Sequence, residues 1–227
     1  QEIQSLEKAI EKLVNKEEPQ IKELELLHKK LGAADIAMFG RMLAANPKYN
    51  IDAAVQVSHA VSVQKVSIEE DYFTAVDDLN RRDEDAGAGH IGVNEFASGV
   101  FYIYICVDRN LLKDNLNSDF ELSSKSLQAL TQAALTVTPS GKQNSFASRA
   151  YASYVLAEKG DKQPRTLVTS FIDPIDNGDM VGKAITKLQE TKGNMDSVYG
   201  SSATTEYVLD VHNRKGKLDE LMQFVAE

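Results

Sequence analysis

The chain has 227 residues, of which 42% are apolar and 26% charged, values typical of a globular protein that buries its own core. It carries 34 acidic and 25 basic residues, and the net charge of −9 counts against nucleic-acid binding through bulk charge alone. The single cysteine, Cys106, excludes an intramolecular disulfide and any multi-cysteine metal site. Because the sequence has no apolar run of membrane-spanning length and no signal-peptide pattern, we expect a cytoplasmic protein.

The first part of the sequence has the apolar spacing of helices. Apolar residues recur three and four positions apart in residues 1–31, which predicts two helices that meet near Pro19. A shorter helix is expected at 34–45. The chain starts inside this helical pattern without an initiator methionine, so we expect a fragment that lacks an N-terminal part.

After residue 46 the apolar pattern changes to a period of two. Segment 53–66 alternates valines with small polar residues, which predicts one long strand with a single core face. Segment 93–108 is rich in aromatic and β-branched residues and predicts a second long strand. Between them, residues 67–90 form a polar excursion, so we expect an antiparallel pair with a protrusion at its end.

The remaining elements alternate in type. We expect helices at 127–137, 179–193 and 216–227, and strands at 145–158, 165–172 and 205–212. Helices followed by mixed strands and helices indicate an α+β fold with a mostly antiparallel sheet covered on one face. We place a helical portion at 1–46 and a sheet-containing portion at 47–227.

No constellation of residues in the sequence favours catalysis. Gly87, Gly89 and Gly92 spell G-x-G-x-x-G, but acidic residues precede this motif and a strand follows it, whereas a dinucleotide site needs a strand before and a helix after. The four histidines are far apart and have no carboxylate or cysteine at ligand spacing. We therefore expect no enzyme activity, no metal and no cofactor.

Charge and aromatic residues are unevenly distributed. Residues 67–90 contain eight acids and two bases, whereas 136–165 contain five bases and two acids. Tyr72 and Phe73 lie within the acidic segment. Two alternatives remain for this aromatic pair: it docks onto its own domain, or it is an exposed wedge that stacks on a base or enters a neighbour.

Five sequence blocks, in order along the chain, together resemble one known family. They are DIAMFGRM (35–42), VSHAVSVQKV (57–66), DYFTAVDDL (71–79), GHIGVNEFASGVFYIYICVDRNLL (89–112) and TPSGKQNSFA (138–147). The family is CasC (Cse-four), the repeated backbone subunit of the type I-E CRISPR Cascade complex. The resemblance implies an RRM-like antiparallel palm sheet, a helical fingers region that includes 1–46, and a protruding thumb hairpin at 67–90.

The resemblance also implies which residues contact RNA. These residues are Arg41, Met42, Tyr72, Phe73, Thr74, Lys142 and Gln143. In such proteins an aromatic residue at the thumb tip, here Phe73 beside Tyr72, interrupts the guide–target duplex at regular intervals. Met42 would pack against RNA, Arg41 would reach a phosphate, and Lys142 would neutralise a phosphate near a palm loop.

The function implied by the resemblance is binding. Copies of the chain would polymerise along a CRISPR guide RNA and support its pairing with a target DNA strand in antiviral defence. The partners would be the guide RNA, the target strand, neighbouring copies and other Cascade subunits, with no membrane. Two alternatives remain open: a helical protein–protein interaction module without RNA binding, and a dinucleotide-using enzyme built on the glycine loop.

Overall fold

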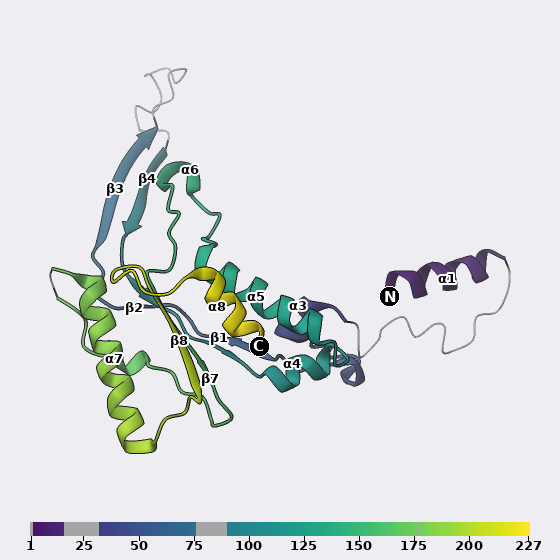
Figure 1. The fold of residues 1–227 in the computed structure, drawn as a ribbon. Coiled ribbons are helices and arrows are strands. Elements are labelled where there is room, and N and C mark those ends of the chain that lie inside the picture. The colour runs from purple at the N-terminus through teal and green to yellow at the C-terminus, as the bar shows by residue number, and fades with distance from the viewer. Residues whose placement is uncertain (1, 16–31, 76–89, 177) are drawn as a thin grey trace, which may run out of the picture. The chain divides into compact units, whose positions relative to one another are not determined.

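A computed structural model describes residues 2–15, 32–75, 90–176 and 178–227 (Figure 1). The chain divides into two compact units, each built from segments distant in sequence. Unit 1 consists of residues 1–58, 105–164 and 202–227, and unit 2 of residues 59–104 and 165–201. The boundary expected after residue 46 stays a prediction.

The elements are helices and short antiparallel strand pairs. Unit 1 contains α1 (Glu2–Val14), α3 (Ala34–Phe39), η1 (Pro47–Tyr49), β1 (Val55–Val57), β6 (Ile105–Val107), α4 (Arg109–Asn115), α5 (Phe120–Thr136), α6 (Gln143–Phe146), β7 (Tyr154–Lys159), β8 (Thr205–Asp210) and α8 (Leu218–Ala226). Unit 2 contains β2 (Val61–Ser62), β3 (Ile68–Ala75), β4 (His90–Ala97), β5 (Phe101–Tyr102), η2 (Val168–Phe171) and α7 (Met180–Tyr199).

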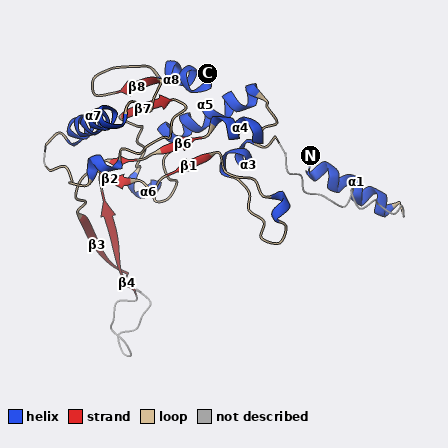
Figure 2. Cartoon of the chain, turned by 90° about the horizontal axis from the view of Figure 1, so that it is seen from below, coloured by secondary structure: helices blue, strands red, loops and turns tan. Residues whose placement is uncertain are grey.

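The strands pair as β1–β6, β2–β5, β3–β4 and β7–β8, all antiparallel. The opposite directions of β3 and β4 can be followed in Figure 2. The mixed fold with antiparallel pairing agrees with the α+β expectation. The residues that the structure describes form four two-stranded sheets.

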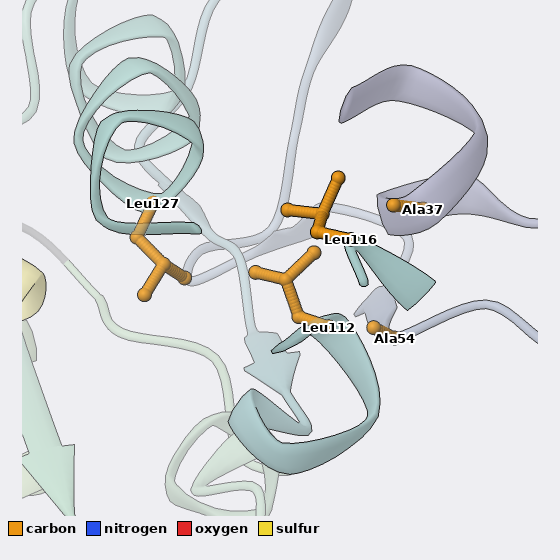
Figure 3. Packing of buried hydrophobic residues seen from close by; sticks show 5 residues of the cluster. All are labelled: Ala37, Ala54, Leu112, Leu116 and Leu127. Carbon is orange, nitrogen blue, oxygen red and sulfur yellow. The ribbon is translucent and has the colours of Figure 1, made fainter. Parts of the chain in front are cut away.

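The best-packed part of unit 1 is a small apolar cluster. It consists of Ala37, Ala54, Leu112, Leu116 and Leu127, contributed by α3, the approach to β1, α4, the end of α4 and α5 (Figure 3). The two helices that supply the leucines, α4 and α5, each begin with a side-chain cap. The carboxylates of Asp108 and Asp119 each accept the backbone N–H of the residue three positions later, at 2.9 Å. These caps fix where the buried leucines lie.

A second packed region of unit 1 joins its C-terminal helix to a hairpin. Helix α8 contacts both α5 and β8. Leu221 of α8 is fully buried. Lys159 Nζ donates to the backbone carbonyl of Phe224 at 2.8 Å and lies 4.2 Å from the centroid of the Phe224 ring. These two contacts hold β7 to α8 as well.

Unit 2 is organised around α7. The Lys183 and Lys187 ammonium groups donate to the carbonyls of Asp176 and Asp173, at 3.0 and 2.8 Å, and so hold the preceding loop against the helix. Asp196 accepts from Lys192 at 2.8 Å and from Arg165 at 3.0 Å. The Lys192 hydrogen bond, helped by Arg165 and opposed by partial burial, lowers the pKa of Asp196.

The two long strands expected from the sequence are broken. Segment 53–66 yields β1 and β2, which pair in different sheets, and 93–108 yields the end of β4, then β5 and β6. The single core face is also wrong: Val55 and Val63 are buried, whereas Val57 is 50% exposed. The chain leaves extended pairing at residues 58–60, so the alternation does not continue across the break.

Several other expectations need correction. Within 165–172, where a strand was expected, Val168–Phe171 form the short 3₁₀ helix η2, and Phe171 is buried. The strand expected at 145–158 starts only at Tyr154, after α6. The helix expected at 34–45 ends at Gly40, whose φ of 77° and close approach to the backbone of Ile51 leave no room for a side chain.

Other elements are confirmed. The helix α1, the helices near 179–193 and 216–227 and the strand near 205–212 all form. The helix expected at 127–137 begins earlier, at Phe120, because Asp119 caps it. The second N-terminal helix, expected between residues 19 and 31, lies outside the described residues.

Candidate nucleic-acid interface

The aromatic pair lies in a two-stranded ribbon of unit 2. The ribbon pairs β3 with β4 over eight positions, among them Tyr72 with Val93, Phe73 with Gly92 and Thr74 with Ile91 (Figure 1). Within the segment 67–90, expected as a polar excursion, Ile68–Ala75 thus form a strand, and residues 76–89 lie outside the described part. Tyr72 and Phe73 sit within a strand rather than at a tip.

The two aromatic side chains lie on opposite faces of the ribbon, because successive residues of a strand alternate. Tyr72 is 62% exposed and Phe73 is 39% exposed. Phe73 is more covered because the outer end of its ring lies over its cross-strand partner: a Cβ placed on Gly92 would come 2.4 Å from Phe73 Cζ and 2.7 Å from Cε1. Phe73 thus combines contact with its own ribbon and exposure to solvent.

The described part of the ribbon carries only negative formal charge. Glu69, Glu70, Asp71 and Glu95 are exposed, and residues 68–75 and 90–97 include no lysine or arginine. Carboxylates at these positions repel phosphate. A nucleic acid that meets this surface would therefore approach it with its bases rather than with its backbone.

Arg41 and Met42 begin a loop of unit 1 that follows α3. The backbone of Arg41 bridges to Ile51 in both directions at 2.9 Å, and its Nε and Nη2 donate to the Tyr49 carbonyl at 3.2 and 3.1 Å. The guanidinium therefore closes the loop on itself. Met42 beside it is 84% exposed, an unbranched apolar side chain directed at solvent.

The loop that contains Lys142 has an unusual backbone. Lys142 (φ 52°, ψ 24°) and Ala147 (φ 47°, ψ 37°) both adopt the left-handed conformation and flank the short helix α6. Non-glycine residues in this region cost roughly 1–2 kcal/mol each. The Lys142 ammonium is exposed and lies 5.9 Å from the ring centroid of Phe146. The strain shows that the surrounding loop holds Lys142 in a defined place.

Gln143 supplies that hold. Its Nε2 donates to the Pro139 carbonyl at 2.6 Å, and also lies 3.4 and 3.3 Å from the carbonyl and hydroxyl oxygens of Ser148. Its Oε1 is buried and has no hydrogen-bond partner. The side chain therefore connects the two ends of the loop from within, a role that sequence reasoning missed when it placed Gln143 among the RNA contacts.

The seven predicted residues fall into separate groups. Arg41, Met42, Lys142 and Gln143 belong to unit 1, and Tyr72–Thr74 belong to unit 2. The sequence reasoning also missed Gly92 as the partner of Phe73, although the glycine motif had singled it out. Nothing in the sequence indicated that Tyr49 would accept hydrogen bonds from Arg41.

No group of three or more His, Cys, Asp or Glu side chains is placed to hold a metal ion in the described part of the chain. No helix within the described ranges has both the length and the apolar character needed to cross a membrane.

Comparison with known proteins gives matches to one family and to solved structures. The family described as CT1975-like protein matches residues 1–225. A chain of a structure named "CRISPR RNA-guided surveillance complex, pre-nicking" superposes with a TM-score of 0.75 at 26% identity, over 92% of this chain and 58% of that one. A chain of a "CRISPR RNA-guided surveillance complex" gives a TM-score of 0.71 at 27% identity, over 84% of this chain and 78% of the other. No curated protein sequence matches.

Proposed function

Because the chain belongs to the CT1975-like protein family, we propose that it is a guide-RNA-binding backbone subunit of a Cascade-type CRISPR surveillance complex. The observation that carries the proposal is the structural similarity to chains of two such complexes. The chain spans 58% of the length of the first of these relatives, so the activity of the whole protein is part of the proposal.

In unit 1, RNA would be held through its backbone. Lys142 presents an exposed ammonium from a loop that Gln143 closes, and a cation held in place loses less entropy when it meets a phosphate. Nothing lies within 4 Å of the position a Cβ would take on the neighbouring Gly141, so a nucleic acid can approach the backbone there. Phosphate contacts of this kind position the RNA without reading its sequence.

In unit 2, the ribbon would contact bases. Tyr72 and Phe73 offer rings on its two faces, and contact between an aromatic side chain and a base is worth about 1–3 kcal/mol for any sequence. The neighbouring carboxylates keep phosphates away from the same surface. Sequence would then be read by pairing between guide and target, as a surveillance complex requires.

The finer architecture is also part of the proposal. An RRM-like palm would carry a fingers region that includes 1–46 and a thumb that corresponds to the ribbon of β3 and β4. Copies would stack head to tail along the guide, together with other Cascade subunits, in the cytoplasm. The subunit would bind without catalysing a reaction, and cleavage of the target would belong to a separate nuclease.

The proposal is tested by titrating the chain against fluorescently labelled single-stranded RNAs of equal length and unrelated sequence. We expect similar affinities for the different sequences and weaker binding as salt rises, because phosphate contacts release counterions. Lys142→Ala should weaken binding and lower the salt dependence by roughly one released ion. The control is Lys125→Ala, which removes an exposed cation of α5 that is already paired with Glu121 at 2.6 Å.

Absence of RNA binding at the lowest salt, by chain shown to be folded, would refute the proposal. Equal effects of the Lys142 and Lys125 substitutions would refute the assignment of the loop. Strong preference for one sequence would contradict binding through the RNA backbone.

A protein–protein interaction module is the second candidate, and α1 favours it. Ile3, Ile10 and Leu13 of this amphipathic helix are 73%, 50% and 57% exposed. An apolar stripe of this spacing fits a partner helix. This alternative predicts no change in the mass of the chain in solution when RNA is added.

A further inference from the structure

We propose that Gly92 is the positioning residue for Phe73: it provides the space that the outer end of the ring occupies, so that a nucleobase meets the ring held against the ribbon rather than extended from it. The inference deepens the proposed function and rests on it.

The geometry singles out the space above Gly92. An added Cβ would lie 2.4, 2.7 and 3.2 Å from Cζ, Cε1 and Cε2 of Phe73, and the first two distances are too short for the ring to stay in place. All three contacts are to one side chain, and they are the nearest that the Cβ would make. A methyl group at residue 92 would therefore act on the position of the Phe73 ring.

The backbone of Gly92 gives no separate reason for a glycine. Its φ lies outside the left-handed region, so an alanine there would adopt the same strand conformation without strain. Alanine would also restrict the unfolded chain, which favours folding where the native conformation is compatible. The reason for glycine at residue 92 is therefore the ring that covers it, a cross-strand arrangement known to compensate for glycine in sheets.

The docked ring is still available to a ligand, because Phe73 remains 39% exposed. A ring that is already fixed loses little conformational entropy when a base stacks on it. Phe73 would therefore act as a preformed surface. Two modes of action can be distinguished: the base stacks on a ring that lies against Gly92, or on a ring that extends away from the ribbon. Displacing the ring from Gly92 weakens binding in the first mode and does not hinder it in the second.

The test uses Gly92→Ala with a matched control. In Gly99→Ala the added Cβ would meet Phe101 and Val66 at 3.6 Å, an ordinary contact, in the same unit and also without a left-handed φ. The probes are a single-stranded RNA and an RNA of equal length that keeps its phosphates but lacks bases at several positions. Proton NMR of the full chain without RNA reports the Gly92 α-protons, which the Phe73 ring current should shift.

We expect Gly92→Ala to weaken binding of the intact RNA about five-fold or more relative to Gly99→Ala, the equivalent of losing roughly 1 kcal/mol of stacking. The effect should be much smaller with the abasic RNA. In a Phe73→Ala background, Gly92→Ala should have no further effect, because the ring that the methyl displaces is gone. The ring-current shift of Gly92 should disappear in Phe73→Ala.

Equal or tighter binding by Gly92→Ala than by Gly99→Ala would overturn the inference, as would an unshifted Gly92 α-proton in the unsubstituted chain. An equal loss with intact and abasic RNA would overturn the stacking role. Failure of the unsubstituted chain to bind any RNA would overturn the proposed function and with it the role of the base, while the NMR shift would still show whether Gly92 positions the ring.

Discussion

Substitution of Leu112 by alanine should be among the most destabilising single changes in unit 1. Leu112 is fully buried in one cluster with Ala37, Ala54, Leu116 and Leu127 (Figure 3), and the methyl side chains of the two alanines are too short to fill the space that it would leave. Asn115 Nδ2 also ties the Ala37 carbonyl to that of Asp52, at 3.0 Å each, which restrains the backbone around the cavity. The site therefore has little freedom to collapse.

The expected loss can be divided into two contributions. Removing the outer carbons of the side chain costs about 2–2.5 kcal/mol at roughly 0.8 kcal/mol per buried methylene. A cavity that does not collapse adds about 1–2 kcal/mol. Together they predict a decrease in the free energy of unfolding of about 3–4.5 kcal/mol for Leu112→Ala.

The assay is urea unfolding followed by circular dichroism, with Val211→Ala as the control. Val211 belongs to the same unit and is 62% exposed, so its truncation should change stability by less than about 0.5 kcal/mol. A loss below about 1 kcal/mol for Leu112→Ala, at an unchanged slope with urea, would show that the cluster is not packed as described.

Three further predictions concern a helix cap, an ion pair and the Lys142 loop. Asp179→Ala should destabilise α7 by about 1 kcal/mol in urea unfolding and Asp179→Asn by less, because the cap accepts the Gly182 N–H at 2.9 Å. Because the pKa of Asp196 is lowered in the folded chain, its ionised carboxylate contributes its full stabilisation above about pH 4, and this stabilisation is lost as the pH falls through the lowered pKa. Asp196→Asn should therefore reduce the dependence of the free energy of unfolding on acid pH. Gln143→Leu should weaken RNA binding without adding to the loss caused by Lys142→Ala; additive losses would contradict a positioning role.

Local signals in the sequence were sufficient for some elements. Helix α7 and strand β8 follow from apolar periodicity and a capping aspartate, which depend only on neighbouring residues. The breaks between β1 and β2 and between β4, β5 and β6 depend on which strand pairs with which, and a valine-rich run does not contain that information. For η2, β-branched composition favours a strand, but the backbone of Val168–Phe171 forms a 3₁₀ helix that buries Phe171.

For the candidate site, residue types were more predictable than their roles. The exposed Met42 and Lys142 lie on the surface as expected. The side chains of Gln143 and Arg41 each donate to a backbone carbonyl of their own loop, that of Pro139 and that of Tyr49. A nearby carbonyl of this kind competes with an external ligand for the N–H groups of the side chain. The contact between Phe73 and Gly92 depends on the register of β3 against β4. The two residues lie nineteen positions apart, and the sequence alone does not indicate that they pair.

The central claim, that copies of this chain line up along a guide RNA, is tested most directly by the mass of the complex as a function of RNA length. Native mass spectrometry of the chain with single-stranded RNAs of increasing length should show the number of bound chains rising in regular steps. The number should fall as salt rises. A constant single chain on every RNA, or no complex with any of them, would contradict the account.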